Sequence, residues 1–497
     1  MRYKKILLVE GPGIRLRSAG KNLGSVRTNH PKISQLMLAA TVRQNLPDAD
    51  VKIIDMKSAN PSNETKIREI DYGGRTIEVF RKGQDFAEIE KDVKDSDAMI
   101  CTCNFSQEAG VTGDLIQFAK KVNSRIRVLV GGSDAAVARK EVNRQAYFYS
   151  RHADYVAPLG DGELVLPLLL RGGILSMNMS GRILSDLDDV PNPAFHLVDL
   201  NSYNEDHEGP LPDGVAPPLM YLETSRGCRQ CCDNCSTPFT KGKYRFMSQK
   251  RIEGLLRCYK DAGIKTLLLV EDNILSRLDF PGGRQAVIEW FTRMRSEGFL
   301  WEFSNGIELG KLAPNMKLDE ELMEILFGFD GISGCYRTNI PLERVDKLAY
   351  RKLVPFEMNK RILASILRHH VPMLTVGIII GHPRETRDSL DDTERKLKEF
   401  TRLVQELSDG KTQVYTCVFL HTPLPGTNDY KRFHAEGRLA FDINEYPELY
   451  NFYTSVVNGK EFPFHEMTKL RREMALQVNG EDALKAWENS GKYEYKK

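Results

Sequence analysis

The sequence predicts an α/β protein. A doubly wound, Rossmann-like parallel sheet comes first, followed by a partial (β/α)6 barrel and a helical C-terminal region. Two observations predict this fold class. Apolar runs that suit buried strands alternate with helical patterns over residues 1–175 and again over 219–425. A Pro- and Asp-rich segment with little periodicity, residues 176–218, separates the two regions and reads as a linker. Residues 426–497 form the remaining, mostly helical part.

The first domain offers five strand candidates. KKILLVEG (4–11) is a continuous apolar run, as expected for a strand buried on both faces. VKIIDM, AMICTC, RVLVGG and DYVAPL follow at 51–56, 98–103, 127–132 and 154–159, with helices over 32–45 and 108–123. Residues 66–80 alternate around a Gly-Gly pair, which predicts a hairpin. The stretch after the first strand, with Arg15 and Arg17, reads as a long polar loop.

Small and polar residues follow several of these strands, at the carboxyl edge where open α/β sheets bind ligands. Glycine at a strand end lets the backbone approach a large or phosphate-bearing ligand, although tight turns explain glycine equally well. No G-x-G-x-x-G follows the first strand, so a dinucleotide site is unsupported. The candidate ligand contacts are Ser106, Gly131, Gly132, Ser133, Gly162 and Glu163.

The second domain repeats one strand–helix unit six times. Strands are predicted to begin near 219, 266, 299, 330, 373 and 413. Helices are predicted near 248–260, 283–296, 318–327, 357–369 and 389–408. Such a pattern predicts a curved parallel sheet with its chemistry at the carboxyl ends of the strands.

Length and charge indicate how many domains the protein has and which kinds of partner are not expected. A chain of 497 residues has room for two or three domains. Lys and Arg total 70 against 68 for Asp and Glu, so neither a nucleic-acid footprint nor a polybasic membrane arm is expected. No apolar run approaches the ~20 residues of a membrane span, and the N-terminus lacks the apolar stretch of a signal peptide. A cytoplasmic protein is expected.

The strongest chemical signal is a cysteine cluster. Four of the nine cysteines lie in TSRGCRQCCDNCSTP, directly after the strand LMYLET (219–224). The ligand register is either Cys228-x3-Cys232-x2-Cys235 or Cys228-x2-Cys231-x3-Cys235. Both place three thiolates on one short loop, which suits an iron–sulfur cluster held at three corners with its fourth iron open. A four-cysteine zinc site is the alternative, but structural zinc usually joins two knuckles across a longer loop.

The first register, placed after the first strand of a βα barrel, resembles the radical S-adenosylmethionine (SAM) superfamily. VGIIIGHPRET (376–386), CVFLHTPLPGTNDY (417–430) and LLLVEDN (267–273) resemble its fifth-, sixth- and second-strand segments. DLDDVPNPA, VGGSDA and ADYVAPLGDGE resemble the linker and N-terminal domain of its cobalamin-binding members. The resemblance covers roughly residues 1–430. The chain departs from it by lacking D-x-H-x-x-G after the first strand and by having Asn234 where relatives carry an aromatic residue.

The resemblance implies three cofactors: a 4Fe-4S cluster on Cys228, Cys232 and Cys235, SAM, and cobalamin. Cys231 is then not a cluster ligand. The candidate ligand contacts of the first domain, from Ser106 to Glu163, are implied to bind cobalamin. Tyr336 and Cys335 are the catalytic candidates, because GCYRTNIP (334–341) is expected to end the fourth strand. The residues expected to contact SAM are Asn234, Glu271, Asn305, Arg337 and Gly381.

The implied activity is methylation of an unactivated carbon in a small-molecule metabolite or natural product, through a 5′-deoxyadenosyl radical and methylcobalamin. A low-potential electron donor such as flavodoxin or ferredoxin is the implied partner. Ring formation, rearrangement or oxidation with cobalamin is the main alternative. A tRNA methylthiotransferase is less favoured, since that family has three N-terminal cysteines and this chain has Cys101 and Cys103 there. A zinc-stabilised binding module is the non-enzymatic alternative.

Overall fold

The computed structural model describes residues 3–24, 30–136, 148–157, 160–171, 183–203, 211–345 and 354–490. The chain forms two compact units. The first unit contains Met1–Glu205, Asp233–Gly242 and Thr422–Val456, and the second contains Asp206–Cys232, Lys243–His421 and Val457–Lys497. The end of the predicted fifth strand, residues 158–159, and parts of the predicted linker lie outside the described residues.

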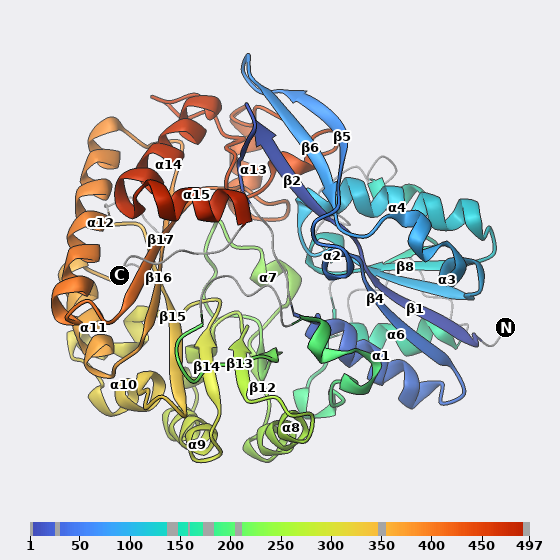
Figure 1. Ribbon diagram of the computed structural model, residues 1–497, viewed down its shortest axis with the longest axis horizontal. Helices are drawn as coiled ribbons and strands as arrows, with labels where there is room; N and C mark the ends of the chain where they lie inside the picture. Colours follow the sequence, from blue (N-terminus) through green and yellow to red (C-terminus); the bar gives the residue numbers. More distant parts are fainter. Residues whose placement is uncertain are drawn as a thin grey trace. The chain divides into compact units, whose positions relative to one another are not determined.

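The first unit contains the predicted parallel sheet, with strand order β4-β1-β7-β8-β9. The helices α1 (Ile33–Asn45) and α6 (Gly162–Leu170) pack on one face through apolar side chains, and α3 (Glu90–Lys94) and α4 (Ala109–Val122) lie on the other (Figure 1). The doubly wound prediction is therefore confirmed. The strands are β1 (Lys5–Glu10), β4 (Asp50–Asp55), β7 (Ala98–Thr102), β8 (Arg127–Gly131) and β9 (Tyr155–Val156), and α2 (Met56–Ala59) follows β4.

A second, antiparallel sheet of four strands is inserted into this unit, in the order β3-β2-β6-β5. The predicted hairpin is confirmed as β5 (Glu64–Asp71) and β6 (Thr76–Lys82). The long polar loop predicted after the first strand is wrong, because β2 (Gly13–Ser18) pairs with β6 and β3 (Lys21–Asn22) extends the sheet. The alternation of GIRLRS buries Ile14 and Leu16, and it was the available signal for a strand.

The second unit contains a six-stranded parallel sheet in sequential order. Helices α8 (Gln249–Asp261), α9 (Gly283–Ser296), α10 (Glu320–Phe327), α11 (Phe356–Arg368) and α12 (Arg387–Leu407) cover its outer side (Figure 1). The partial (β/α)6 barrel is therefore confirmed. Its strands are β10 (Leu219–Leu222), β13 (Thr266–Leu269), β14 (Leu300–Phe303), β15 (Gly334–Glu343), β16 (Met373–Ile380) and β17 (Gln413–Leu420).

One strand starts later than predicted. Residues near 330 form a turn, in which the Asp330 carboxylate accepts the backbone N–H groups of Ile332 (2.9 Å) and Ser333 (2.7 Å). An Asx-type turn of this kind competes with strand pairing. β15 therefore begins at Gly334 and runs ten residues to Glu343, which changes the position of every residue that was assigned to its end.

The C-terminal region is helical as predicted, with α13 (Asn428–Ala435), α14 (Phe464–Asn479) and α15 (Glu481–Ser490), but it divides between the two units. α14 covers the edge strand β17. The Asn479 side chain bonds both the N–H and the C=O of Thr416, at 2.8 Å each, and Arg471 donates to the Val418 carbonyl at 2.8 Å. These side chains satisfy backbone groups that a free edge strand would expose.

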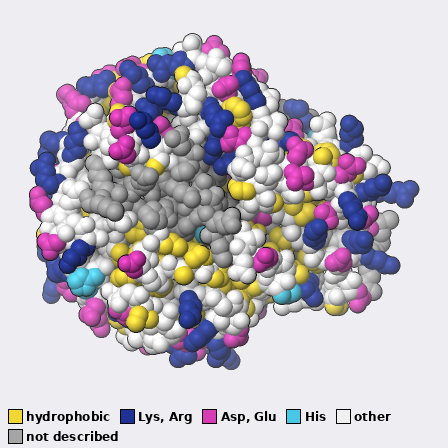
Figure 2. All heavy atoms as spheres, in the orientation of Figure 1, with side chains coloured by type: hydrophobic (Ala, Val, Ile, Leu, Met, Phe, Trp, Pro, Cys, Tyr) yellow, Lys and Arg dark blue, Asp and Glu magenta, His cyan; other side chains and the backbone are white. Residues whose placement is uncertain are grey.

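The surface carries both signs of charge. Lys and Arg side chains are interspersed with Asp and Glu over the visible face (Figure 2), in keeping with the small net charge. In the part of the chain that the structure describes, every helix is too short or too polar to cross a membrane.

Candidate active site at the carboxyl edge of the barrel

The cysteine-bearing loop leaves the barrel at the end of β10. A two-stranded antiparallel ribbon, β11 (Ser225–Arg226) with β12 (Arg245–Phe246), follows β10 at once. Gly227, which precedes Cys228, has a φ of +87°, a left-handed conformation that favours glycine. The ribbon and this glycine turn together set the direction in which the loop starts.

Three consecutive residues at the end of β13 hold the loop in register. Glu271 accepts hydrogen bonds from the Thr224 N–H (3.1 Å) and hydroxyl (2.9 Å). The Asp272 carboxylate accepts the Gly227 N–H at 2.8 Å. The Asn273 amide donates to the Cys228 sulfur at 3.5 Å. The acidic VEDN segment therefore does lie at the cysteine loop, as the sequence predicts.

A carboxylate from the third strand end completes this network. Glu308, which follows β14, accepts the amide N–H groups of Asn273 at 2.7 Å and Gln230 at 2.9 Å. The backbone N–H of Gln230 points to the Cys228 sulfur at 3.4 Å. Two N–H groups therefore face this sulfur, and hydrogen bonds to cysteine sulfur are common around iron–sulfur clusters. Gln230 was not predicted as a site residue, because its contact with Glu308, 78 residues away, exists only in the folded chain.

The cysteines of the motif differ in exposure. Cys232 is buried, Cys228 and Cys235 are half-buried, and Cys231 is exposed. Cys235 lies in the 233–242 segment, which belongs to the first unit, as does Asn234 with its buried Oδ1. Among the described residues, no three His, Cys, Asp or Glu side chains converge as ligands of one metal ion.

Two buried acceptor atoms at this edge lack a partner. Glu271 Oε2 and Asn273 Oδ1 make no hydrogen bond, although each residue is only 3% exposed. Burial raises the pKa of the Glu271 carboxyl to about 7, against the lowering effect of its hydrogen bonds with Thr224. Unpaired buried acceptors are costly, so they are suited to a ligand that brings N–H donors. Together with the thiolates, this donor set fits an iron–sulfur cluster that binds an amine-bearing ligand.

The other predicted strand-end residues divide into two groups. Gly381 follows β16 with a φ of +87°, and the unpartnered Asn339 Oδ1 lies near Gly377 on the neighbouring strand. These positions leave backbone and an acceptor at the carboxyl edge. Asn305, by contrast, donates its amide to the carbonyls of Val270 (2.8 Å) and Glu271 (3.3 Å), so its amide nitrogen braces β13.

The expected position of Tyr336, Cys335 and Arg337 is wrong. All three lie in the first half of β15, where Cys335 pairs with Trp301 and Arg337 with Glu302 of the four-residue strand β14. A β-bulge leaves Tyr336 as an extra residue, so that its hydroxyl donates to Glu302 at 2.7 Å while Arg337 lies 3.5 Å from the same carboxylate. Cys335 is fully buried, and burial raises the pKa of its thiol. These side chains therefore lie within the sheet and not at the end of β15.

The carboxyl edge of the first unit contains the other predicted contacts. Ser106 donates to the buried carboxylate of Asp134 at 2.6 Å, and Tyr149 donates to the same carboxylate at 2.7 Å. A Cβ on Gly132 would lie 2.3 Å from the Cys103 carbonyl, and its φ is +109°. Turn geometry and internal hydrogen bonding thus explain Ser106 and Gly132.

The remaining predicted ligand contacts in this unit differ in how much space surrounds them. Gly131 faces open space within 4 Å of an ideal Cβ. A Cβ on Gly162 would meet Leu38 of α1 at 2.8 Å, so this glycine allows close helix packing. Ser133 receives support through its backbone N–H, which Asn104 accepts at 3.3 Å, and Glu163 is half-buried at the start of α6. Gly131 is therefore the position most open to a ligand.

A buried charge cluster at the same edge was not predicted. The Lys57 ammonium lies 2.8 Å from Glu10 at the end of β1 and 2.6 Å from Glu108 after β7. Thr102 at the end of β7 donates to Glu10 as well. The cluster lies where β1 and β7 are neighbours and the strand order reverses, the usual crevice of such sheets. Its members are far apart in the sequence, so only the fold could reveal it.

Comparison with known proteins gives a family for the barrel. The sequence model of the radical SAM superfamily matches residues 222–397. The ribosomal protein uS12 methylthiotransferase RimO of Clostridioides difficile is 26% identical over 224 residues, which is 42% of this chain and 46% of that protein. Cytidylyl-2-hydroxyethylphosphonate methyltransferase of Streptomyces wedmorensis is 26% identical over 37% of this chain and 32% of its own length. The chain thus spans less than half of either relative.

Among solved structures, the cobalamin-dependent S-adenosylmethionine radical enzyme OxsB resembles nearly the whole chain. The match covers 96% of this chain and 67% of OxsB, with a TM-score of 0.63 and 15% sequence identity. A likeness at that identity concerns the fold, and it extends from the first unit through the barrel to the C-terminal helices. Residues 222–397 of this chain thus match the radical SAM superfamily, and the fold of the chain is similar to that of the cobalamin-dependent enzyme OxsB.

Proposed function

We propose that this protein is a cobalamin-dependent radical SAM enzyme that methylates an unactivated carbon of a small-molecule substrate. The observation that carries the proposal is the cysteine loop, whose register is set by Glu271, Asp272 and Asn273 at the next strand end. Cys228, Cys232 and Cys235 would hold the cluster, since Cys232 is buried and Cys231 is exposed. When bound, the cluster and SAM supply a radical that abstracts hydrogen, and cobalamin supplies the methyl group.

The residues of the chain bind and orient. The unpartnered Glu271 Oε2 and Asn273 Oδ1 would accept hydrogen bonds from the amino group of SAM. Gln230 and Asn273 would direct N–H groups at the Cys228 sulfur, a contact that tunes cluster potential in iron–sulfur proteins. The open backbone at Gly131 and the glycine turn after it would receive cobalamin. A flavodoxin or ferredoxin would supply electrons.

Methylthiolation is the activity of one relative, RimO, and it is less favoured here. The resemblance that implies it also calls for three N-terminal cysteines to hold an additional cluster. The cysteines before the barrel are Cys101 and Cys103, which are both fully buried in and after β7. Burial raises the pKa of Cys101 to about 12 and raises that of Cys103 as well, so both favour the thiol over the metal-binding thiolate. The similarity to a methyltransferase is consistent with methyl transfer, and the two N-terminal cysteines are the observation that favours it over methylthiolation.

The test is anaerobic reconstitution with iron, sulfide and hydroxocobalamin, followed by SAM and a low-potential reductant. Formation of both S-adenosylhomocysteine and 5′-deoxyadenosine, with bound corrin in the optical spectrum, supports methyl transfer. 5′-Deoxyadenosine without S-adenosylhomocysteine supports the rearranging or oxidative alternative. Purified protein that holds zinc and takes up no iron would contradict both.

A matched pair of variants tests the ligand register. Cys232→Ala is expected to abolish iron incorporation and SAM cleavage, because it removes a proposed ligand. Cys231→Ala, at the adjacent exposed position, is expected to retain both. The reverse result would assign the cluster to the other register.

A further inference from the structure

A basic segment follows the cysteine loop. Residues 241–260 contain seven Lys and Arg residues and one acidic residue, although the whole chain carries a net charge of +2. The segment includes β12, the second strand of the ribbon that leaves β10, and most of α8. Positive charge is therefore concentrated on the elements that come directly after the proposed cluster ligands.

Arg229 joins the cysteine loop to an aromatic pair. It follows Cys228 directly, and its guanidinium lies 5.1 Å from the centre of the Phe280 ring. Phe280 packs edge-on against Phe246 of the ribbon, with 5.2 Å between the ring centres. Both phenylalanines are half-buried, so the protein covers them only in part. Arginine and aromatic side chains are enriched at the centre of protein–protein interfaces.

Basic residues lie at both ends of this chain of contacts. In the ribbon, the Arg245 Nε donates to the carbonyl of the exposed Lys243 at 3.3 Å. At the other end, Asp279 lies 3.3 Å from Arg229 and also pairs with Lys311. These residues lie in the second unit. The surface that we call the ribbon patch consists of Arg229, Lys243, Arg245, Phe246, Phe280 and Lys311.

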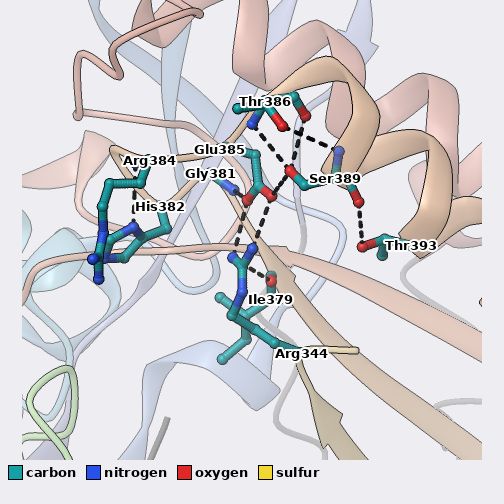
Figure 3. A network of polar contacts seen from close by, with 9 residues as sticks. All are labelled: Arg344, Ile379, Gly381, His382, Arg384, Glu385, Thr386, Ser389 and Thr393. Carbon is teal, nitrogen blue, oxygen red and sulfur yellow. Dashed lines mark hydrogen bonds and ion pairs between the residues drawn. The ribbon is translucent and has the colours of Figure 1, made fainter. Parts of the chain in front are cut away.

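The exposed arginine of the patch differs from a structural arginine of the same barrel. Arg344 is 2% exposed and meets Glu385 through two contacts of 2.8 and 2.9 Å (Figure 3). Arg229 is 49% exposed, and its contact with Asp279 is longer, at 3.3 Å. The Arg344 charge is therefore committed to the protein, whereas the Arg229 charge can act on a partner in solution.

The ribbon itself brings like charges together. Arg226 and Arg245 are directly opposite each other in β11 and β12, and Glu223 lies 2.9 Å from Arg226. Like charges directly opposite are unfavourable in a pair of strands, so the stability of the ribbon does not explain an arginine at position 245. A negatively charged partner would explain it.

We infer that the ribbon patch docks an acidic one-electron carrier protein beside the cysteine loop. The inference rests on the proposed function, in which a cluster on this loop takes one electron from outside for each SAM that is cleaved. The docked carrier gives one electron to the cluster and is itself oxidised by one electron, and no covalent bond joins the two proteins.

The physical features of the patch suit such a partner. Opposite charges steer transient encounters, and weak electron-transfer complexes bury little surface, less than about 1,200 Å² in total. A nucleic acid is less favoured, because the Asp279 carboxylate lies between Arg229 and Lys311 and would repel phosphate groups.

The test compares carrier proteins with dithionite, a reductant too small to need docking. Arg229→Gln/Lys243→Gln removes two positive charges from the patch and is expected to form 5′-deoxyadenosine at the wild-type rate with dithionite. With limiting reduced flavodoxin or ferredoxin, the rate is expected to fall about five-fold or more, because weaker steering lowers the encounter rate. The dissociation constant of oxidised flavodoxin, measured by calorimetry on the reconstituted protein, is expected to rise by a similar factor. For wild type this constant is expected to rise with salt.

Arg361→Gln/Arg402→Gln is the matched control. It removes two exposed positive charges from α11 and α12, which cover a part of the barrel far from α8 (Figure 1). Wild-type rates are expected with every reductant. Lys243→Glu, which lies outside the cysteine loop, provides an independent test if the double variant loses iron.

The outcomes separate the two proposals. If wild type cleaves SAM and the patch variants bind and use flavodoxin and ferredoxin equally well, docking at the patch is refuted while the proposed function stands. A wild type that uses dithionite but neither binds nor oxidises either carrier has the same meaning. An equal loss of rate with dithionite and with the carriers also refutes docking, since the residues would then act on the cluster itself.

Two further results would overturn the inference. Binding of a single-stranded RNA oligonucleotide at the patch, in place of the carriers, would assign this surface to nucleic acid. A reconstituted wild type that cleaves no SAM with dithionite refutes the proposed function and, with it, this inference.

Discussion

Replacing Lys57 with methionine would remove the cation that Glu10 and Glu108 share in the first unit. The side chains of these three residues are between 2% and 7% exposed, and the two ion-pair distances are 2.8 and 2.6 Å. Methionine is similar in length and apolar, so the change removes the charge with little loss of volume. Both carboxylates would remain buried, with Lys32 as a nearby charge.

The magnitude follows from the geometry. Two unit charges 2.8 Å apart attract by about 6 kcal/mol at an effective dielectric constant of about 20, and desolvation offsets much of this. Breaking a buried pair by removing one partner costs about 3–5 kcal/mol, because the other charge stays uncompensated. Lys57→Met is therefore expected to lower the free energy of opening of the first unit by about 3–5 kcal/mol.

The cost should depend on pH. Burial by itself would raise the pKa of Glu10, and Lys57 counteracts it so that the pKa lies below its usual range; burial raises the pKa of Glu108 despite Lys57. Without Lys57, both folded-state pKa values lie above the unfolded ones. The protonated forms then support folding at low pH, and that support is lost as pH rises through the raised values. The deficit of the variant is expected to be smaller at pH 5 than at pH 8.

Native-state hydrogen exchange measures this locally. Peptides covering β1 (5–10) and β4 (50–55) should exchange roughly two to four orders of magnitude faster in Lys57→Met, provided that exchange reports the opening equilibrium. Lys52→Met on β4 is the control, since Lys52 and Asp92 form a pair with side chains 55% and 30% exposed. An exposed pair contributes about 1 kcal/mol at most. If both variants exchange alike, or if the deficit of Lys57→Met does not change with pH, the reasoning is refuted.

Three further predictions concern the two candidate sites. Because the raised pKa of Glu271 favours its protonated form in the folded state, the wild-type apoprotein is expected to lose stability as the pH rises through about 7. Urea unfolding detected by tryptophan fluorescence should show a wild-type difference of up to about 3 kcal/mol between pH 5 and pH 8. Glu271→Gln is expected to abolish this difference. Tyr336→Phe is expected to lower stability by about 1–3 kcal/mol, because it removes the buried donor to Glu302, and to retain 5′-deoxyadenosine formation. A stable Tyr336→Phe variant that no longer cleaves SAM would instead support a catalytic role for Tyr336. Gly132→Ala is expected to reduce the amount of bound corrin, measured optically, since its Cβ would lie 2.3 Å from the Cys103 carbonyl. Gly131→Ala is the control and should fold normally. Equal corrin content and equal stability in the two variants would contradict the argument that the turn requires Gly132.

Local pattern was sufficient for the architecture of the barrel and for the cysteine motif. Strands begin at 219, 266, 373 and 413, the positions near which they were predicted, since an apolar run between helical segments is visible in a short window. The spacing of Cys228, Cys232 and Cys235 likewise lies within eight residues. The acidic segment at Glu271 was also predicted at the site, because a strand end is a local feature.

The fourth strand shows where local pattern fails. The turn at Asp330 delays β15 by four residues, and the strand then runs on to Glu343. Tyr336 therefore lies in the first half of β15 and not at its end. Its apolar neighbours indicate a buried strand, but they do not indicate which part of the strand they occupy. Strand register depends on the pairing with β14 and β16, which sequence periodicity does not contain.

The sequence by itself thus determined the order of the elements, the three-thiolate motif and the class of chemistry, because each depends on residues that are neighbours in the chain. The tertiary structure decided which side chains surround that motif and which ones hold it in place. Lys57 reaches a partner 51 residues away, and Arg344 reaches one 41 residues away. Such ion pairs form only in the folded chain, where partners distant in the sequence meet away from water, so no local sequence pattern predicts them.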